Sequence, residues 1–372
     1  MGALRRTAAT ASSALEAFAA AAPGLESLVA GELKALGIAP RAEAGGVGFR
    51  GTMEAVARAN LWLRTASRVL VRAAAFRAQA FHELERLARA IPWERYLTAG
   101  APVRFRVTSR KSRLYHTGAI EQRFAEAIEH RLGKASEVES STEDDDTNSA
   151  SSSAQLFVIR VLNDAFTVSA DSSGALLHQR GYRQAVAKAP LRETLAAAML
   201  IGADWTGATP LLDPFCGSGT IPIEAALLAR RIPPGSARNF AFPTWPEVKP
   251  SIWAKAREDA ESVALPRSPV EIRGSDRDRG AIEASIANAE RAGVASDIEF
   301  SVRAVSAVEN STDTIGLVVT NPPYGVRVGE VDRLRDLYAR LGQVLRTKCP
   351  GWEVAMLSAN ARLEKELRLS LR

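Results

Sequence analysis

Cysteine and histidine are scarce in this 372-residue sequence, which contains two cysteines and four histidines. Cys216 and Cys349 cannot alone supply the four ligands of a structural zinc site, and the histidines are scattered along the chain. We therefore expect no structural metal. So few cysteines are also typical of proteins that fold in a reducing compartment.

Long apolar runs are lacking as well, since no segment approaches the roughly 20 apolar residues that a membrane-spanning helix needs. Residues 1–22 are rich in alanine and contain Arg5 and Arg6, as a secretory signal does, but Glu16 interrupts their apolar run. The sequence therefore predicts a cytoplasmic protein with no membrane partner.

The composition that is present is that of an ordinary globular protein, with 46% hydrophobic and 24% charged residues. The length is sufficient for two or more domains, each with its own core. The 48 lysines and arginines exceed the 42 acidic residues, and the formal charge of +6 makes a polyanionic partner plausible without identifying one.

Residues 15–98 have the pattern of an α+β domain. A helix is predicted from Leu25 to Leu36, closed by Gly37. Residues 45–49 predict a turn into a short strand, and a second helix is predicted around Phe81–Leu87.

A strand with one apolar and one basic face opens the next region, residues 101–183. Apolar and polar residues alternate from Val103 to Thr108, and Arg104 and Arg106 occupy polar positions. Three more cations follow in a predicted loop: Arg110, Lys111 and Arg113. These five cations are candidate contacts to a polyanion, and the alternative is a solvated strand face.

The rest of this region predicts a helix, an insertion and a hairpin. The helix runs from about Gly118 to Leu132, and the Ser/Glu/Asp-rich run Ser136–Ser153 predicts a disordered surface insertion. Apolar strands over 156–161 and 166–170 flank Asn163-Asp164, an acceptable hairpin turn.

From about Pro190 the pattern changes to alternating strands and helices, which predicts an open, mostly parallel, doubly wound sheet of the α/β class. Ligands bind such sheets at the carboxyl ends of the strands. The predicted strands are 211–215, 270–275, 298–302, 315–320 and 354–357, and the predicted helices are 221–230, 278–291 and 331–345.

The segment DPFCGSGT at residues 213–220 ends the first of these strands. Gly217 and Gly219 allow a tight turn and close approach of a ligand, and Thr220 is a candidate cap for the following helix. The lysine of a phosphate-binding loop is missing. Asp276 ends the next strand, where a carboxylate can accept both ribose hydroxyls, although nearby Asp278 could equally be a helix cap. The pattern predicts a site for a nucleoside-bearing cofactor.

The segment Asn321-Pro322-Pro323-Tyr324 follows the fourth predicted strand. The Asn321 side chain and the Pro322 carbonyl can accept the two hydrogens of a planar NH2 group, and the prolines stiffen the backbone that holds these acceptors. Tyr324 can stack on a base. An Asn-Pro turn after a strand is also common without any function. Together with the upstream loop, the segment predicts methyl transfer from S-adenosylmethionine to an exocyclic or amide nitrogen.

With these motifs, residues 190–360 resemble a class I S-adenosylmethionine-dependent methyltransferase of the NPPY type. More narrowly, the chain resembles the THUMP-domain RNA methyltransferases that make N2-methylguanosine in bacterial 23S rRNA or tRNA. The supporting segments are APGLE at 22–26, LHQRGYR at 177–183, APLRETLAA at 189–197 and FAFPTWP at 240–246, ahead of Trp253.

The resemblance implies a Rossmann-like methyltransferase fold preceded by α+β ferredoxin-like and THUMP domains. It implies a ferredoxin-like domain over 15–100, a THUMP RNA-binding domain over 101–183 and a methyltransferase domain over 190–372. It also implies S-adenosyl-L-methionine as cofactor, RNA as partner, and contact of Thr194 with the carboxylate end of the cofactor.

The chain departs from the family in two ways. Relatives carry an acid after the third strand, whereas Ser301–Ser306 contains none, so that Ser306 or a backbone group would substitute and Glu309 is a distant candidate. Relatives also continue into a closing antiparallel strand pair, whereas this sequence stops at Arg372, so that the methyltransferase domain is expected to lack its last strands.

The predicted function is methylation of guanine N2 in structured RNA, with 23S rRNA favoured over tRNA. The alternatives are N6-adenine methylation of RNA or DNA, methylation of a glutamine amide in a protein, and a non-catalytic RNA-binding ribosome assembly factor. The predicted catalytic residues are Asn321, Pro322, Pro323 and Tyr324; the cofactor residues are Thr194, Asp213, Phe215, Gly217, Gly219, Thr220 and Asp276; the RNA-binding residues are Arg104, Arg106, Arg110, Lys111 and Arg113.

Overall fold

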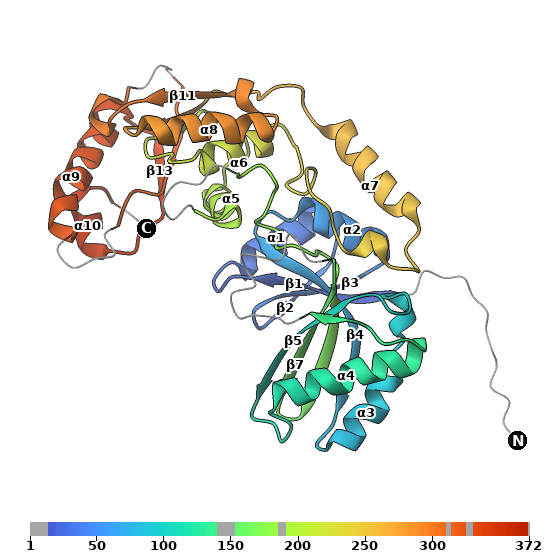
Figure 1. The fold of residues 1–372 in the computed structure, drawn as a ribbon. Coiled ribbons are helices and arrows are strands. Elements are labelled where there is room, and N and C mark those ends of the chain that lie inside the picture. The colour runs from blue at the N-terminus through green and yellow to red at the C-terminus, as the bar shows by residue number, and fades with distance from the viewer. Residues whose placement is uncertain (1–13, 140–152, 185–190, 310–313, 325–329, 371–372) are drawn as a thin grey trace, which may run out of the picture.

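Two lobes, each built on its own β-sheet, make up the chain (Figure 1). The structure is a computed structural model that describes residues 14–139, 153–184, 191–309, 314–324 and 330–370. Most of the acidic insertion predicted over Ser136–Ser153 lies outside these residues. Among the helices of the described ranges, none is long and apolar enough to cross a membrane.

The N-terminal lobe contains an eight-stranded sheet in the order β2-β3-β1-β4-β8-β7-β5-β6. Its strands are β1 (Leu15–Ala21), β2 (Pro40–Glu43), β3 (Gly46–Gly51), β4 (Ala66–Arg77), β5 (Val103–Arg110), β6 (Val138–Glu139), β7 (Gln155–Leu162) and β8 (Ala165–Asp171). Its helices are α1 (Glu26–Ala35), α2 (Met53–Trp62), α3 (Phe81–Arg89) and α4 (Thr117–Leu132). Strand β4 pairs with both β1 and β8, so the sheet continues across the predicted domain boundary near residue 100.

Strand β1 forms from an alanine-rich segment, although alanine favours helices. It lies between β3 and β4, which satisfy its backbone groups on both edges, and Ala17 and Ala19 are fully buried. Gly46 of β3 permits the close approach, because a Cβ there would lie 2.2 Å from the Ala19 carbonyl oxygen. Pairing between distant segments therefore overrides the local preference for a helix.

Helices α3 and α4 cover one face of the β5–β7 half of the sheet (Figure 1). Trp93, Phe105, Phe124 and Phe157 are fully buried there, with the Trp93 and Phe157 rings edge to face at 5.1 Å. The predicted hairpin turn is confirmed, since β7 and β8 are antiparallel and the two turn residues have positive φ. The opposite face of these strands carries the alternate, more polar positions.

The C-terminal lobe contains five parallel strands in the order β11-β10-β9-β12-β13, which confirms the doubly wound sheet predicted from sequence. Its strands are β9 (Leu211–Asp213), β10 (Ile272–Asp276), β11 (Ile298–Val302), β12 (Leu317–Thr320) and β13 (Glu353–Met356). Its helices are α5 (Glu193–Gly202), α6 (Thr220–Ala229), α8 (Arg279–Arg291), α9 (Glu330–Lys348) and α10 (Ala361–Glu366), whereas α7 (Pro250–Val263) packs on α2 and the core of the N-terminal lobe.

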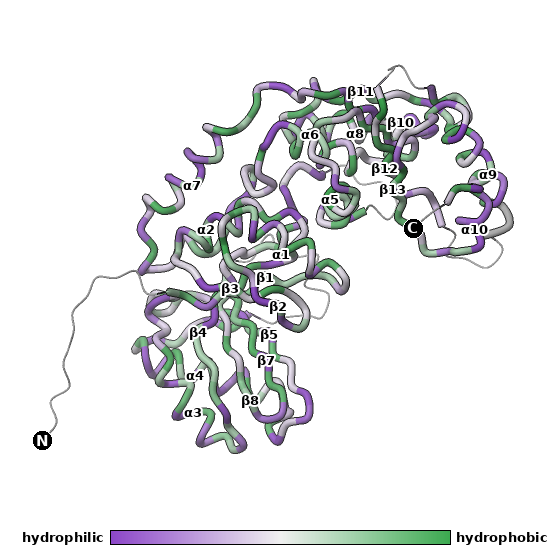
Figure 2. The backbone as a smooth tube through the Cα atoms, turned by 180° about the vertical axis from the view of Figure 1, so that it is seen from behind, coloured by the Kyte–Doolittle hydropathy of each residue, from purple (hydrophilic) through white to green (hydrophobic). Residues whose placement is uncertain are grey.

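The two faces of this sheet are covered by different helices, and successive strand residues alternate between them. Leu211 and Val319 pack with α5, α6 and α8, whereas Leu212 and Val318 pack with α9 and α10. The apolar strands appear as a green centre flanked by the more hydrophilic α9 in Figure 2. This arrangement leaves the carboxyl ends of β9, β10 and β12 together at one edge.

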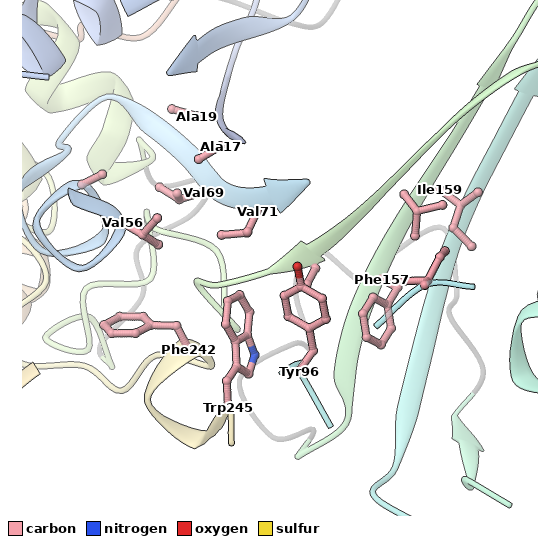
Figure 3. Packing of buried hydrophobic residues seen from close by; sticks show 14 of the residues in the cluster. Ala17, Ala19, Val56, Val69, Val71, Tyr96, Phe157, Ile159, Phe242 and Trp245 are labelled. Atoms are coloured by element: carbon pink, nitrogen blue, oxygen red, sulfur yellow. The ribbon is translucent and has the colours of Figure 1, made fainter. Parts of the chain in front are cut away.

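A segment of the C-terminal half closes the core of the N-terminal lobe. Phe242 and Trp245 are buried there (Figure 3). The Trp245 indole NH donates to Gln155 Oε1 at 2.7 Å. The Trp245 ring meets Tyr96 edge to face at 5.0 Å. These contacts explain the aromatic segment at 240–246 structurally: it joins the lobes.

Buried ionic groups join the lobes a second time. Arg180 donates to the Arg64 carbonyl at 2.6 Å and lies 3.5 Å from Glu224 of α6. Tyr182 also donates to Glu224, at 3.1 Å, and Arg64 donates to the Ile232 carbonyl at 2.6 Å. Removing one partner from such a buried pair strands a charge, which costs about 3–5 kcal/mol.

Candidate active site

The loop between β9 and α6 turns through two left-handed glycines, Gly217 (φ 54°) and Gly219 (φ 85°). A Cβ on Gly219 would lie 3.0 Å from the Ser285 Cβ, so a side chain there would be both strained and crowded. Gly219 is the N-cap of α6, so the prediction that Thr220 caps the helix is wrong. Thr220 is the first helical residue, and its Oγ1 accepts a hydrogen bond from Arg183 at 3.0 Å.

Helix α8 holds this loop from behind. Ser285 Oγ donates to the Gly217 carbonyl at 2.7 Å, and Asn288 Nδ2 donates to the Ser218 carbonyl at 3.0 Å. Both side chains are fully buried. Sequence reasoning missed them, because only their spacing of three, which places them on one helix face, could have marked them.

Asp213 links the loop between β9 and α6 to the segment that follows β12. Its Oδ1 accepts hydrogen bonds from Phe215 N at 3.1 Å and from the Thr320 hydroxyl at 2.8 Å, and Thr320 directly precedes Asn321. Burial raises the pKa of Asp213 to about 7, and the charge of Asp276 contributes in the same direction. The carboxyl therefore titrates near neutrality, and a bound cation would favour its ionised form.

Asp276 lies at the end of β10, beside the loop. Its Oδ2 accepts from Gly217 N at 3.1 Å, and its Oδ1 accepts from Asp278 N at 3.0 Å. Asp278 is the cap of α8, with its Oδ1 bonded to the amide of Gly280 at 2.8 Å. Asp278 is therefore a helix cap. Each Asp276 oxygen accepts one hydrogen bond and keeps a lone pair for a ligand hydroxyl.

The Asn-Pro-Pro-Tyr segment leaves the end of β12 directly after Thr320, which is bonded to Asp213. Asn321 Oδ1 is buried and has no hydrogen-bond partner among the residues that the structure describes. Tyr338 of α9, itself fully buried, donates from its hydroxyl to the Pro323 carbonyl at 3.1 Å. Tyr324 is 37% exposed. A buried acceptor without a donor is costly in a folded protein and is typical of a functional group.

No acid follows β11, in agreement with the sequence. Val305–Ala307 is a single 3-10 turn with Ser306 exposed. Arg303 N donates to the Asp276 carbonyl at 2.8 Å, which holds this turn beside β10. The Glu309 carbonyl accepts from Arg273, and the Glu309 side chain is exposed.

The predicted RNA-binding residues divide into buried and exposed ones, all in the N-terminal lobe and away from the strand ends above. Arg104 is only 5% exposed, so a solvated strand face, the alternative considered for these cations, does not describe this position. Arg106 is partly buried, and Arg110, Lys111 and Arg113 are exposed. The alternation of residues along β5 predicted which side of the sheet these side chains lie on. It did not predict how deeply each of them is buried.

The predicted cofactor residues suit S-adenosylmethionine. Thr194 and Asp213 are buried and Phe215 is partly buried, and a Cβ at Gly217 would meet no described atom within 4 Å, which leaves room for a ligand to approach the backbone there. No group of three metal-ligating side chains occurs in the described parts of the chain. A glycine turn at a helix start, an acid ending the second strand and Asn-Pro-Pro-Tyr after the fourth strand together define a class I S-adenosylmethionine-dependent methyltransferase.

Comparison with family models places the chain more narrowly. Residues 180–371 match the RMKL-like methyltransferase domain, and residues 16–70 match the RlmL ferredoxin-like domain. The chain therefore belongs to the RMKL-like methyltransferase family, whose cofactor is S-adenosylmethionine.

Two curated relatives cover nearly all of the chain. The ribosomal RNA large subunit methyltransferase K/L of Syntrophotalea carbinolica is 39% identical over 94% of this chain and 50% of its own length. The putative RNA methyltransferase YpsC of Bacillus subtilis is 36% identical over 93% of this chain and 88% of its own. The chain thus spans about half the length of the first relative and most of the second.

Solved structures agree with the fold. A predicted N6-adenine-specific DNA methylase from Listeria monocytogenes is 37% identical, with a TM-score of 0.86 over 95% of this chain and 91% of its own. A putative methyltransferase solved in complex with SAH is 30% identical, with a TM-score of 0.84 over 95% and 92%.

Proposed function

We propose that this protein transfers a methyl group from S-adenosylmethionine to the exocyclic N2 of a guanine in structured RNA, with 23S rRNA favoured over tRNA. The Asn321 Oδ1, buried and without a hydrogen-bond partner in the part of the chain that the structure describes, carries the proposal. The ribosomal RNA substrate named for the Syntrophotalea relative and the RNA substrate named for YpsC support the choice of RNA.

Asn321 and Pro322 would perform the orientation step. The lone pair of an aromatic NH2 is delocalised into the ring, so the group is a weak nucleophile. The Asn321 Oδ1 and the Pro322 carbonyl would accept its two hydrogens and direct the lone pair at the sulfonium methyl group, which the cofactor supplies. Holding reactants in such a geometry contributes about 7–11 kcal/mol in the most favourable cases. Once the N–C bond forms and the C–S pair returns to sulfur, water would take the extra proton.

Tyr324 would hold the ring of the target base. A guanine inside a helix cannot reach a buried acceptor, so the base has to leave the stack, and an aromatic side chain that stacks on it offsets part of that cost. The Tyr338 hydroxyl fixes the Pro323 carbonyl between these two functional groups. Burial raises the pKa of Tyr338 to about 12, so this hydroxyl remains a donor at any physiological pH.

A basic surface of the N-terminal lobe would hold the rest of the RNA, as expected if residues 101–183 are a THUMP domain. Arg77, Arg110 and Arg160 are exposed and lie on the strand face opposite α3 and α4, since strand register places Arg77 beside Ala165. Tyr115, 65% exposed, adds an aromatic ring beside the cationic loop. Phosphates and unstacked bases are what such a surface recognises.

Replacing Arg110, Lys111 and Arg113 together with alanine is expected to weaken RNA binding, because a protein that contacts fewer phosphates releases fewer counterions when it binds. The slope of log K against log salt should become shallower by about 2–3 for three lost contacts. Filter binding at several salt concentrations measures it. Alanines at three exposed cations outside this surface, Lys255 and Arg257 of α7 and Arg267 after it, provide a control of equal charge change. An unchanged slope in the first variant would contradict this surface.

The substrate class is tested by methyl transfer from labelled S-adenosylmethionine to four acceptors from cells lacking the protein: 23S rRNA, tRNA, DNA and ribosomal protein. Label in 23S rRNA alone is expected. Label in DNA would favour the activity named for the Listeria structure, and label in protein would favour a glutamine amide. Cofactor binding with no acceptor labelled would instead support an RNA-binding factor.

A further inference from the structure

An exposed aromatic pair lies in the loop between β5 and α4 of the N-terminal lobe. Tyr115 is 65% exposed, more than any other large apolar side chain in the described parts of the chain. His116 is also exposed, and the centroids of the two rings lie 4.1 Å apart with their planes tilted by 37°. Leu114, just before them, is buried and anchors the loop in the core. Most of the Tyr115 side chain is therefore left to solvent on an anchored segment.

The backbone of this loop is fixed by the turn between β7 and β8. Arg113 N donates to Asp164 Oδ1 at 2.8 Å, and Asp164 N donates to Ser112 Oγ at 3.0 Å. Ser109 Oγ of β5 donates to the Leu114 carbonyl at 2.7 Å, directly before the aromatic pair. A partner that binds Tyr115 therefore meets a backbone that is already ordered, so little conformational entropy is lost on binding.

Three exposed cations belong to the same loop: Arg110, Lys111 and Arg113. Within the described residues, none of them forms an ion pair with an acid. Asp164 is the acid that contacts the loop, and its two oxygens accept from neutral donors, the Arg113 backbone amide and, at 2.9 Å, the Gln79 side-chain amide. The positive charge of the three side chains therefore remains available to an anion.

An ordered aromatic ring beside available cations suits a nucleotide of a single strand. The base offers a flat face that stacks on an aromatic ring, and the phosphates offer oxygens to the cations. In a duplex both faces of each base are covered by its neighbours, so an unpaired nucleotide is needed to present that face. The RNA substrate of the proposed function favours a nucleotide over an acidic peptide.

This loop is remote from the candidate active site. Gln155 at the start of β7 contacts Trp245 where the lobes join, whereas Leu162 at the end of β7 pairs with Arg110 at the base of the loop. The eight residues of β7 span about 23 Å, and β5 and β7 extend away from the C-terminal lobe (Figure 1). A nucleotide bound at this loop is therefore a different one from the target of methyl transfer.

We propose that Tyr115 and His116 form a stacking site for one unpaired base of the RNA, and that Arg110, Lys111 and Arg113 hold the phosphates beside that base. The inference rests on the proposed function and deepens it, because it names the feature that the N-terminal lobe recognises: a single-stranded nucleotide at a fixed distance from the target. The competing interpretation is an electrostatic surface that takes any polyanion. The two differ in whether the aromatic ring contributes or the charge alone.

Binding of the full-length protein to an RNA decamer, single-stranded or in a perfect duplex, separates the two interpretations. Tyr115→Ala should weaken single-strand binding about 5- to 100-fold, the range for one lost base–aromatic stack, and leave duplex binding within about twofold. Tyr115→Phe and Tyr115→Trp keep a ring and should stay within about threefold of the wild type. The salt dependence of Tyr115→Ala should match that of the wild type, because no charge is removed. Ile315→Ala, at a 61% exposed apolar residue of the C-terminal lobe, is the matched control and should change neither affinity.

Three results would overturn the stacking site: unchanged single-strand affinity in Tyr115→Ala, equal losses on single strand and duplex, or a loss in Tyr115→Phe as large as that in Tyr115→Ala. SAH binding within about twofold of the wild type verifies that each variant is folded, since the cofactor site lies in the other lobe. An acidic peptide whose binding depends on Tyr115, with RNA binding unaffected, would assign the site to a protein partner instead. The expected RNA pattern without methyl transfer to RNA would reject the proposed reaction alone, whereas no RNA binding by the wild type would reject both.

Discussion

Replacing Asn321 with alanine is expected to lower the rate of methyl transfer by about 10²–10³-fold, the loss found when one preorganised hydrogen-bonding group is removed from an active site. Asn321 supplies the side-chain half of the amine clamp, and its Oδ1 has no other partner within the described residues. Single-turnover assays with bound RNA measure this rate. Cofactor and RNA affinity should stay within a few fold, since neither is assigned to this side chain.

The same Asn321→Ala variant is expected to lose activity without losing stability. An unpaired buried oxygen carries a desolvation penalty of about 1–3 kcal/mol, so removing it should leave the free energy of unfolding unchanged or higher. Tyr338→Phe is the matched control, because it frees the Pro323 carbonyl without touching Asn321 and should lower the rate less. Near-normal turnover by the Asn321→Ala protein would refute the amine clamp.

The affinity for S-adenosylmethionine is expected to fall by up to about fiftyfold between pH 7 and pH 5. Asp213 has a pKa of about 7, so below that pH it is protonated and neutral. A bound sulfonium favours the carboxylate, so binding must then release a proton, which costs about tenfold in affinity per pH unit. Above pH 8 the carboxyl is already ionised, and its contribution to the pH dependence should vanish.

SAH isolates the contribution of Asp213, because its sulfur is neutral while its amino group is unchanged. Burial also raises the pKa of Glu193 to about 7, and because the two ligands differ only at the sulfur, its effect should be common to both. Asp213→Asn, which keeps an acceptor for Thr320, should remove the difference between the ligands. Calorimetry in two buffers with different ionisation enthalpies counts the released protons. Identical pH profiles for the two ligands with the wild type would contradict the role of Asp213.

Local motifs allowed much of the fold and of the site's chemistry to be predicted. The order of apolar strands and helices after residue 190 predicted the parallel sheet, and two glycines predicted the tight turn that the structure shows. Asp276 and Asn321 could be assigned to strand ends because the pattern reports where a buried strand stops. Their meeting at one edge follows from the topology of parallel sheets.

Contacts between distant segments could not be predicted from these motifs. Ser285, Tyr338 and Arg183 act through partners that only the folded chain brings near, and no local pattern distinguishes them from ordinary helix or linker residues. The alanine-rich β1 is a strand because two neighbours pair with it. Arg104 was placed on the correct face by alternation, but burial depends on what lies over that face.

The nucleoside that receives the methyl group tests the central claim most directly. Purified protein, labelled S-adenosylmethionine and 23S rRNA from cells lacking the protein would be incubated, and the RNA digested to nucleosides and separated by mass. The proposed clamp and substrate predict label in N2-methylguanosine. Label in N6-methyladenosine, or in a methylated ring nitrogen or ribose, would contradict guanine N2 as the target.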